Sequence, residues 1–555
     1  MRRATLLCLL AACGGDDAPT PPITGDATAH VQHYDYRLDL ASRAAHATVT
    51  LALDTPGNCV ALPFRAGSFT AATALADGAP ATEATLAGGS LKLCAATGHP
   101  AGDTMTIEAD QTVDLATLST SQVGFSITKD SDGNAFTYLV SWVGGCDKFG
   151  PCDSRPDQFA TYTFHVTHDP ALMVRCSGAI TETSPTETQC DFAHPGGPTY
   201  STFGLAAYPA VAWPITDKGM WGSVHVTVYD RPSTGTAAAI NATYHGGFIS
   251  WMESTFGPFP FGSELRVLTA PTYWSGFEHP GNIVLDDTLA HIRFPQYSNT
   301  VAHTLDHEMA HQWAGDQTTI ADTYDFVWKE SMAEYLAFVH EDMTDGAVAL
   351  RTASVWKGLS AQSKYFPVPG EHPALFDYYG DVYGAGPMTL FRQLEVLSSR
   401  DQVIAALKSV LGAPRALSVA ALLAALTTST GLDLTQYAAD WIKGTGAPKW
   451  PRIKTTYTAG TGGTSTLLVQ QTSGKGGCKF HVGLDGANPG EEQLVEVDTY
   501  HHAGAQTLTV PTPAFAVATV VLDPRHECLV FPDGALAARA PGRPWLSARG
   551  DALSR

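Results

Sequence analysis

The stretch His307-Glu308-Met309-Ala310-His311 decides the fold of the middle of this chain, because its spacing is that of a helix carrying a metal site. Two histidines four residues apart lie on one helix face, about one turn from each other, so both imidazoles can reach one ion. Glu330, in the helical stretch 327–340, is a candidate third ligand. Three protein ligands leave one position of zinc for water, whose pKa the metal lowers. The sequence therefore predicts one zinc ion per chain held by His307, His311 and Glu330, with Glu308 as general base.

The residues around this stretch predict a buried helix with supporting polar groups. Apolar residues recur at four-residue steps, at Val301, Leu305, Met309 and Trp313. His303 lies on the histidine face but roughly 12 Å from His311 along the axis, too far to share one ion. We expect His303 to have a supporting or structural role. Glu334 and Asp306 are the nearest candidates to support a zinc histidine.

Further motifs at fixed offsets resemble those of the aminopeptidase N family of zinc metallopeptidases. They are Gln312-Trp313-Ala314-Gly315 after the second histidine, Thr319, and Trp328-Lys329-Glu330-Ser331-Met332-Ala333 around the third ligand. The family also has a Gly-x-Met-Glu-Asn exopeptidase motif upstream of the zinc helix. Its counterpart here is Ser275-Gly276-Phe277-Glu278-His279, in which Ser275 replaces the family's glycine. The resemblance implies a thermolysin-like zincin domain that removes residues from the amino end of peptides.

The upstream segment suits recognition of a free amino terminus. Residues 265–269 alternate like a strand, so the motif would follow a sheet edge at the cleft. A carboxylate is the natural partner of a substrate ammonium, because a charge-assisted hydrogen bond is about twice as strong as a neutral one. We expect Glu278 to bind that ammonium, with Gly276, Phe277 and His279 as further substrate contacts. Phe277 and His279 depart from the family's Met and Asn, which affects the shape of the first substrate pocket.

A tyrosine is expected to stabilise the oxyanion of the tetrahedral intermediate. The family places it in a Tyr-x-x-Gly-Ala-like turn that opens a helix, and Tyr383, in the segment 383–388, fits that position best. Tyr378 and Tyr379 are alternatives whose spacing to the turn fits less well. Ala385 replaces a residue that is often basic in the family.

The amino terminus predicts export. Residues 1–12 resemble a secretion signal, with Arg2 and Arg3 before an apolar run too short to span a bilayer. The following Cys13 resembles the acylated cysteine of bacterial lipoproteins, and residues 13–28 would be a tether. We expect a lipoprotein in the periplasm or at the outer membrane or cell surface, attached through lipid at Cys13. A secreted protein without lipid is the alternative.

Cysteine content and charge fit this compartment. Setting aside Cys8 and Cys13 from the ten cysteines leaves eight, and an even number in an exported chain predicts disulfides. Pairing neighbours in order gives four bridges outside the zinc segment. The net charge of −21 and the absence of a basic patch argue against nucleic-acid binding and against electrostatic binding to membranes.

Composition shifts predict a multidomain α+β fold. Alternating Thr- and Val-rich runs predict an all-β domain over residues 29–213, and helical patterns predict the zinc domain over 214–446. Short strands predict a small β-sandwich over 447–538, followed by a disordered tail at 539–555. The large helical domain of longer family members is missing from this sequence.

The predicted function is therefore a zinc aminopeptidase acting on peptides. A thermolysin-like endopeptidase would share the zinc ligands but would not need Glu278. A catalytically silent scaffold is the third possibility, because some relatives keep this architecture without the activity.

Overall fold

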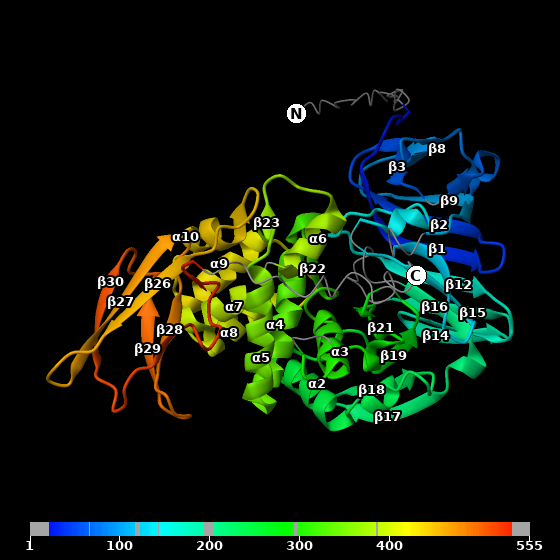
Figure 1. Cartoon of the computed structure of the whole chain (residues 1–555). Helices are drawn as coiled ribbons and strands as arrows, with labels where there is room; N and C mark the ends of the chain where they lie inside the picture. Colours follow the sequence, from blue (N-terminus) through cyan, green and yellow to red (C-terminus); the bar gives the residue numbers. More distant parts are fainter. Residues whose placement is uncertain are drawn as a thin grey trace, which may run out of the picture.

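A computed structural model describes residues 22–534 except positions 66, 117–122, 143, 194–203, 273, 294–296 and 385–386. Figure 1 shows β-sheets at both ends of the molecule, with a mainly helical region between them. The predicted multidomain α+β class is confirmed, with an N-terminal β region, a helical middle and C-terminal β-sheets.

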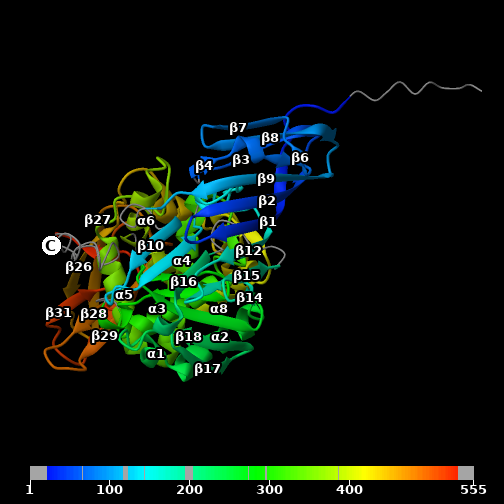
Figure 2. The same cartoon turned by 90° about the vertical axis from the view of Figure 1, so that its right-hand side faces the viewer.

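The N-terminal region is built from alternating strands whose apolar side chains face a shared core. In β1 (Ala29–Asp39), Tyr34, Tyr36 and Leu38 are buried at every second position. Its largest sheet has the order β14-β15-β12-β1-β2-β9-β5-β6, with β4 also paired to β9. The other strands of this sheet are β2 (Ala44–Leu53), β4 (Gly67–Phe69), β5 (Leu75–Ala76), β6 (Ala79–Pro80), β9 (Thr104–Val113), β12 (Thr161–Thr167), β14 (Ala179–Ser184) and β15 (Glu187–Phe192). Figure 2 shows β1, β2 and β9 side by side.

Two smaller sheets complete this region. One has the order β3-β8-β7, and the other has the order β10-β11-β16-β13. Their strands are β3 (Gly57–Pro63), β7 (Glu83–Ala87), β8 (Ser90–His99), β10 (Gly124–Lys129), β11 (Ala135–Val140), β13 (Leu172–Cys176) and β16 (Gly204–Pro209). Short 3₁₀ turns at Ala71–Thr73, Cys146–Lys148 and Ala210–Ala212 connect strands.

A mixed five-stranded sheet carries the segment that borders the candidate site. Its order is β17-β18-β19-β21-β20, in which β18, β19 and β21 are parallel. The bounds are β17 (Ile215–Trp221), β18 (Val224–Tyr229), β19 (Glu264–Ala270), β20 (Gly276–Phe277) and β21 (Asn282–Asp286). The strand predicted at 265–269 is therefore confirmed as β19, and the two-residue β20 lies at the sheet edge, antiparallel to β21.

Helices pack against this sheet and against one another. Their bounds are α1 (Thr236–Ala239), α2 (Ala242–Phe256), α3 (Thr300–His311), α4 (Phe326–Thr344), α5 (Gly346–Ser360), α6 (Leu375–Gly384), α7 (Pro387–Leu397), α8 (Arg400–Leu411), α9 (Val419–Thr430) and α10 (Thr435–Tyr437), which runs into a π-helical turn at Ala438–Ile442. Short 3₁₀ turns at Leu289–His291 and Thr323–Asp325 precede α3 and α4. Two small parallel pairs join β22 (Thr318–Ile320) to β24 (Arg415–Leu417) and β23 (Val368–Pro369) to β25 (Lys443–Gly444).

The helix α3 begins and packs as its sequence predicts. The Asn299 side chain accepts a hydrogen bond from the backbone N–H of Ala302 at 3.1 Å, which satisfies a donor at the helix start. The stripe of Val301, Leu305, Met309 and Trp313 is buried, each at 2% exposure or less. Burying this stripe holds the polar face of α3 against α4 inside the protein.

The C-terminal region consists of two small sheets. One has the order β30-β27-β26-β32 and the other β29-β28-β31. The strands are β26 (Arg452–Thr458), β27 (Thr464–Ser473), β28 (Lys479–Asp485), β29 (Glu492–Asp498), β30 (Gln506–Pro511), β31 (Thr519–Leu522) and β32 (Phe531–Pro532).

The four disulfides follow the predicted pairing of neighbours. They are Cys59–Cys94, Cys146–Cys152, Cys176–Cys190 and Cys478–Cys528. Among the described residues, no helix is long and apolar enough to cross a membrane.

Candidate metal centre

The predicted ligand set converges at the contact between α3 and α4. The Nε2 atoms of His307 and His311 are 3.0 Å apart, and each lies 3.4 Å from Glu330 Oε2. All three residues are buried, and their ligand atoms lie within 4.8 Å of one another. Two imidazoles and a carboxylate are a typical donor set of a catalytic zinc ion.

The outer nitrogens of both histidines orient the inner ones. His311 Nδ1 lies 3.0 Å from the carbonyl oxygen of Ala314, which can only accept, so this nitrogen carries the proton. Its Nε2 lone pair therefore points toward the other two ligands. His307 Nδ1 lies 3.3 Å from Glu334 Oε1, within ion-pair distance but without hydrogen-bond geometry, beside a carboxylate of the kind that supports metal-binding histidines. The residues present therefore fit zinc.

Glu334 belongs to a buried chain of charged groups behind His307. Its Oε2 lies 2.9 Å from His303 Nε2, and His303 Nδ1 lies 2.7 Å from Glu341 Oε1. The ring of Tyr297 stacks on His303 with centroids 3.6 Å apart, and its hydroxyl donates to Glu334 at 3.1 Å. Glu334 therefore lies next to His307, as a supporting residue would, and His303 contacts Glu334; their roles toward zinc stay predictions.

The expectation that Asp306 supports a zinc histidine is wrong. Its two carboxylate oxygens contact His245 at 2.8 Å and His340 at 2.7 Å. Asp306 immediately precedes His307, and one residue turns a helix face by about 100°. Its carboxylate consequently points toward α2 and the end of α4.

Glu308 lies beside the ligands and against the edge strand β20. A Cβ atom at Gly276 would collide with the Glu308 carboxylate, so glycine permits this close approach of the strand. Burial raises the pKa of Glu308 to about 8. The negative charges of Glu278 and Glu330 also raise this pKa, whereas His307 lowers it. A carboxylate whose pKa is near neutral is suited to accept and return a proton.

A small cavity opens next to Glu308. Its volume is about 60 Å³ and its lining includes Ser275, Gly276, Thr304 and Glu334. Three aromatic side chains, Trp274, Tyr297 and Tyr379, also line it. Sequence reasoning did not select Trp274 or Tyr297, because an aromatic residue between two motifs has no spacing signal of its own.

Glu278 contacts a lysine that also contacts the ligand Glu330. The ammonium of Lys329 donates to Glu278 Oε1 at 2.6 Å and to Glu330 Oε1 at 3.0 Å. Although burial favours protonation, Lys329 and His311 hold the pKa of Glu278 below its ordinary value. Glu278 is therefore a carboxylate here, as ammonium binding requires. Sequence reasoning missed Lys329, whose only signal was a lysine adjacent to the third ligand.

Gln312 joins the segment around Glu278 to the zinc helix. Its side-chain nitrogen donates to the Glu278 carbonyl at 2.8 Å, and its side-chain oxygen accepts from the Gly281 N–H at 2.8 Å. Gln312 is fully buried at the C-terminal end of α3. These two bonds set the position of the Glu278 backbone relative to the histidines.

The other predicted substrate residues, Gly276, Phe277 and His279, do not all face the cavity. Gly276 lines the cavity, whereas the Phe277 and His279 side chains are buried at 2% and 3% exposure and stack on each other. A Cβ at Gly204 would collide with the His279 ring, so this ring packs against β16. Contact of Phe277 and His279 with substrate stays a prediction.

Two further predicted residues lie outside the described part. Tyr383 belongs to the last turn of α6, but its side chain is not described. Cys13 lies outside the described residues altogether. Of the two alternative tyrosines, Tyr379 lines the cavity beside Glu308, whereas Tyr378 is fully buried.

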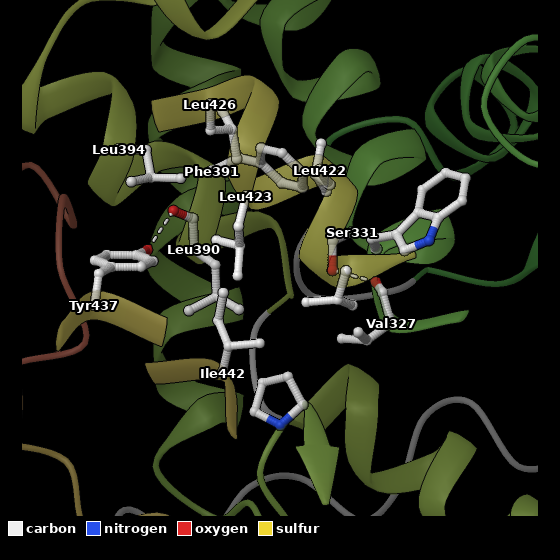
Figure 3. Close-up of a pocket in the computed structure, with 13 residues that line it drawn as sticks. Val327, Ser331, Leu390, Phe391, Leu394, Leu422, Leu423, Leu426, Tyr437 and Ile442 are labelled. Carbon is white, nitrogen blue, oxygen red and sulfur yellow. Dashed lines mark hydrogen bonds between the residues drawn. The ribbon is translucent and has the colours of Figure 1, made fainter. Parts of the chain in front are cut away.

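A separate cavity borders α4, α7 and α9 (Figure 3). Its volume is about 40 Å³, and its walls are mostly apolar. Figure 3 shows Leu390, Phe391, Leu394, Leu422 and Leu426 around it, with the Ser331 hydroxyl bonded to the Val327 carbonyl. This cavity belongs to the helix packing and not to the polar ligand set.

Comparison with known proteins agrees with this geometry. Residues 242–379 match the Peptidase family M1 domain. The chain resembles an M1 zinc metallopeptidase mutant from Deinococcus radiodurans, solved with a Tyr-Ser-Ala substrate, with TM-score 0.61 and 22% identity over 75% of this chain and 94% of that one. It also resembles Legionella pneumophila aminopeptidase A in complex with aspartic acid, with TM-score 0.72 and 16% identity over 92% of this chain and 60% of that one. No curated protein matches the sequence.

Proposed function

We propose that the chain is a zinc-dependent aminopeptidase of the M1 family that removes residues from the amino end of peptides, because residues 242–379 match the Peptidase family M1 domain. One observation carries the proposal. Buried His307, His311 and Glu330 form one ligand set, with Glu308 on the same helix as the histidines and Glu278 linked to Glu330 through Lys329. The similar M1 zinc metallopeptidase mutant from Deinococcus radiodurans, solved with a Tyr-Ser-Ala substrate, supports it.

The chain's own residues divide the work of peptide hydrolysis. Zinc held by His307, His311 and Glu330 would supply a Lewis acid that activates water and polarises the peptide carbonyl. Glu308 accepts the proton of the attacking water and returns it to the leaving amine. Its buried position excludes bulk solvent from that transfer.

Substrate is held by its free end in this proposal. Glu278 binds the peptide ammonium, which aligns the first carbonyl with Glu308. Tyr383 donates a hydrogen bond to the developing oxyanion. The edge strand β20, with Gly276 against Glu308, offers extended backbone along which a peptide can pair.

The decisive experiment compares free aminoacyl fluorogenic amides with their N-acetylated versions. We expect the zinc-loaded protein to cleave the free amides, to lose this activity with chelator, and to leave acetylated amides intact. Glu278→Gln should raise KM for free amides by about 10-fold or more, because a charge-assisted bond is lost. Cleavage of acetylated internal bonds would identify an endopeptidase instead. A zinc-loaded protein inactive on all substrates would identify a scaffold.

We also propose that the chain is exported and acylated at Cys13. The signal-like residues 1–12 and the following cysteine support this proposal. Cells expressing the protein should incorporate labelled palmitate into it. A Cys13→Ser variant that is labelled equally would contradict lipid attachment at this residue.

A further inference from the structure

Lys329 occupies a fully buried position between two functional carboxylates. Its ammonium lies 2.6 Å from Glu278 Oε1 and 3.0 Å from Glu330 Oε1. Glu330 comes from α4, whereas Glu278 follows the edge strand β20, so one side chain bridges two separate elements. Neither motif spacing nor family resemblance assigns Lys329 a role in this chain.

Because of this lysine contact, the two carboxylate oxygens of Glu330 have different partners. Oε1 accepts from Lys329, whereas Oε2 lies 3.4 Å from the Nε2 atoms of both His307 and His311. A carboxylate tied at one oxygen cannot rotate freely about its terminal bond. The other oxygen is therefore held facing the metal position.

The same argument applies to Glu278. Within the described residues, its carboxylate receives its hydrogen bond from Lys329 through Oε1. The lysine ammonium also lies between the Glu278 carboxylate and the ligand Glu330. Without that positive charge, a second buried carboxylate beside the histidines would be able to turn toward the metal as a competing ligand.

Packing fixes the lysine in this orientation. A Cβ atom at Gly315 would come within 2.9 Å of Lys329 Cε and 3.0 Å of His311 Nδ1. Gly315 thus lets the lysine chain pass directly beside the turn that follows the zinc helix. A buried, tightly packed ammonium with two carboxylate partners has little freedom to take other positions.

We propose that Lys329 is a positioning residue that couples amine recognition to metal binding. It holds Glu330 Oε2 toward the metal and keeps Glu278 directed at the substrate ammonium. The inferred effect of Lys329 on metal binding is based on the ligand geometry. Its inferred effect on amine recognition rests on the proposed aminopeptidase function.

The test replaces Lys329 by Met, which keeps most of the side-chain length and removes the charge. We expect the zinc dissociation constant, measured by competition with a chromogenic chelator, to rise about 10- to 100-fold, as it does when groups that orient metal ligands are lost. At saturating zinc, KM for free aminoacyl amides should rise more than kcat falls. A Lys329→Gln variant, which keeps a hydrogen-bond donor, should recover part of both losses and guards against a folding defect in the first variant.

Lys357 provides the matched control. It is also buried and forms an ion pair at 2.5 Å, but its partner is Asp523 in the C-terminal region. Lys357→Met removes another buried lysine charge, outside the site, so zinc affinity and KM should stay at the wild-type values. Circular dichroism compares the folding of both variants.

The outcomes separate this inference from the aminopeptidase proposal. Calorimetric binding of Ala-Ala-Ala and its N-acetylated form in a Glu308→Gln background measures amine recognition without turnover. Weaker zinc binding and weaker binding of the free tripeptide in Lys329→Met support the inference, whichever substrates the active enzyme cleaves. Unchanged zinc affinity would overturn it. A lower KM or tighter binding of the free tripeptide would also overturn it, because Lys329 would then be blocking the ammonium position.

Discussion

The pair of carboxylates around His303 predicts that the zinc-free protein loses stability in mildly alkaline solution. His303 is buried between Glu334, at 2.9 Å, and Glu341, at 2.7 Å. Burial alone would lower the pKa of His303, but the Glu341 and Glu334 carboxylates raise it to about 9. The unfolded chain has the ordinary value of about 6.5.

Proton linkage determines whether stability rises or falls with pH. Between pH 6.5 and 9, the folded state holds a proton on His303 that the unfolded state has lost. The stabilisation is therefore fully present below pH 6.5 and disappears as pH rises through 9. A difference of roughly 2.5 pKa units corresponds to about 3 kcal/mol, an upper value because Glu334 and Glu341 titrate with the histidine.

The assay compares wild type with His303→Gln after zinc removal, by thermal unfolding from pH 6 to pH 10. Gln keeps a hydrogen-bonding side chain but carries no titrating group. We expect the melting temperature of wild type to exceed that of the variant most at pH 6, by several degrees, and the difference to shrink toward pH 10.

The control is His526, a histidine whose pKa is lowered instead of raised. Burial and the nearby Lys357 lower the pKa of His526 to about 4, so His526→Gln should show no such trend over this pH range. A wild-type excess for His303 that stays constant from pH 6 to pH 10 would refute the reasoning. It would mean that His303 is neutral in the folded protein.

Three other changes test the site and the fold. Glu334→Gln should weaken zinc binding about 10- to 100-fold in a chelator competition, and unchanged affinity would show that Glu334 does not orient His307. Glu308→Gln should bind one zinc ion normally while kcat falls by about 10²–10⁴-fold, and loss of metal in parallel would contradict a base that is not a ligand. Replacing both Cys478 and Cys528 by Ser should lower the free energy of unfolding of the C-terminal sheets by about 2–5 kcal/mol in urea titrations, with zinc affinity unchanged. A fall in zinc affinity would show that this disulfide supports the metal centre.

Local pattern was sufficient to predict that His307 and His311 converge. Spacing along one helix determines that His307 and His311 share a face, and the buried stripe of α3 confirms the direction of that face. Strand alternation likewise predicted the β regions, because the period of two is visible in any short window. Pairing cysteines in chain order was correct since each pair lies within one β region.

Contacts between side chains on separate helices and strands could not be predicted from local sequence patterns. Lys329 and Glu278 are 51 residues apart, and neither position has a pattern that points to the other. For Asp306 a contact was predicted that does not exist. Asp306 is next to His307 in the sequence, but the helix turns its side chain to another face, where it contacts His245. The role of Phe277 and His279 was inferred from their place in a motif; both side chains are buried, and their contact with substrate stays a prediction.

Among the four glutamates around the ligand set, Glu278, Glu308, Glu330 and Glu334, only Glu308 has a raised pKa. Each of two cationic side chains bridges two carboxylates, Lys329 between Glu278 and Glu330, and His303 between Glu334 and Glu341. These bridges stabilise the charged carboxylates, and the pKa values of Glu278, Glu330 and Glu334 are accordingly lowered despite burial. Glu308 has no such bridge among the described residues, and its pKa is raised to about 8 instead. Among Glu278, Glu308, Glu330 and Glu334, the carboxylate with the raised pKa is therefore the one beside the cavity, which is where the proposed hydrolysis requires a base.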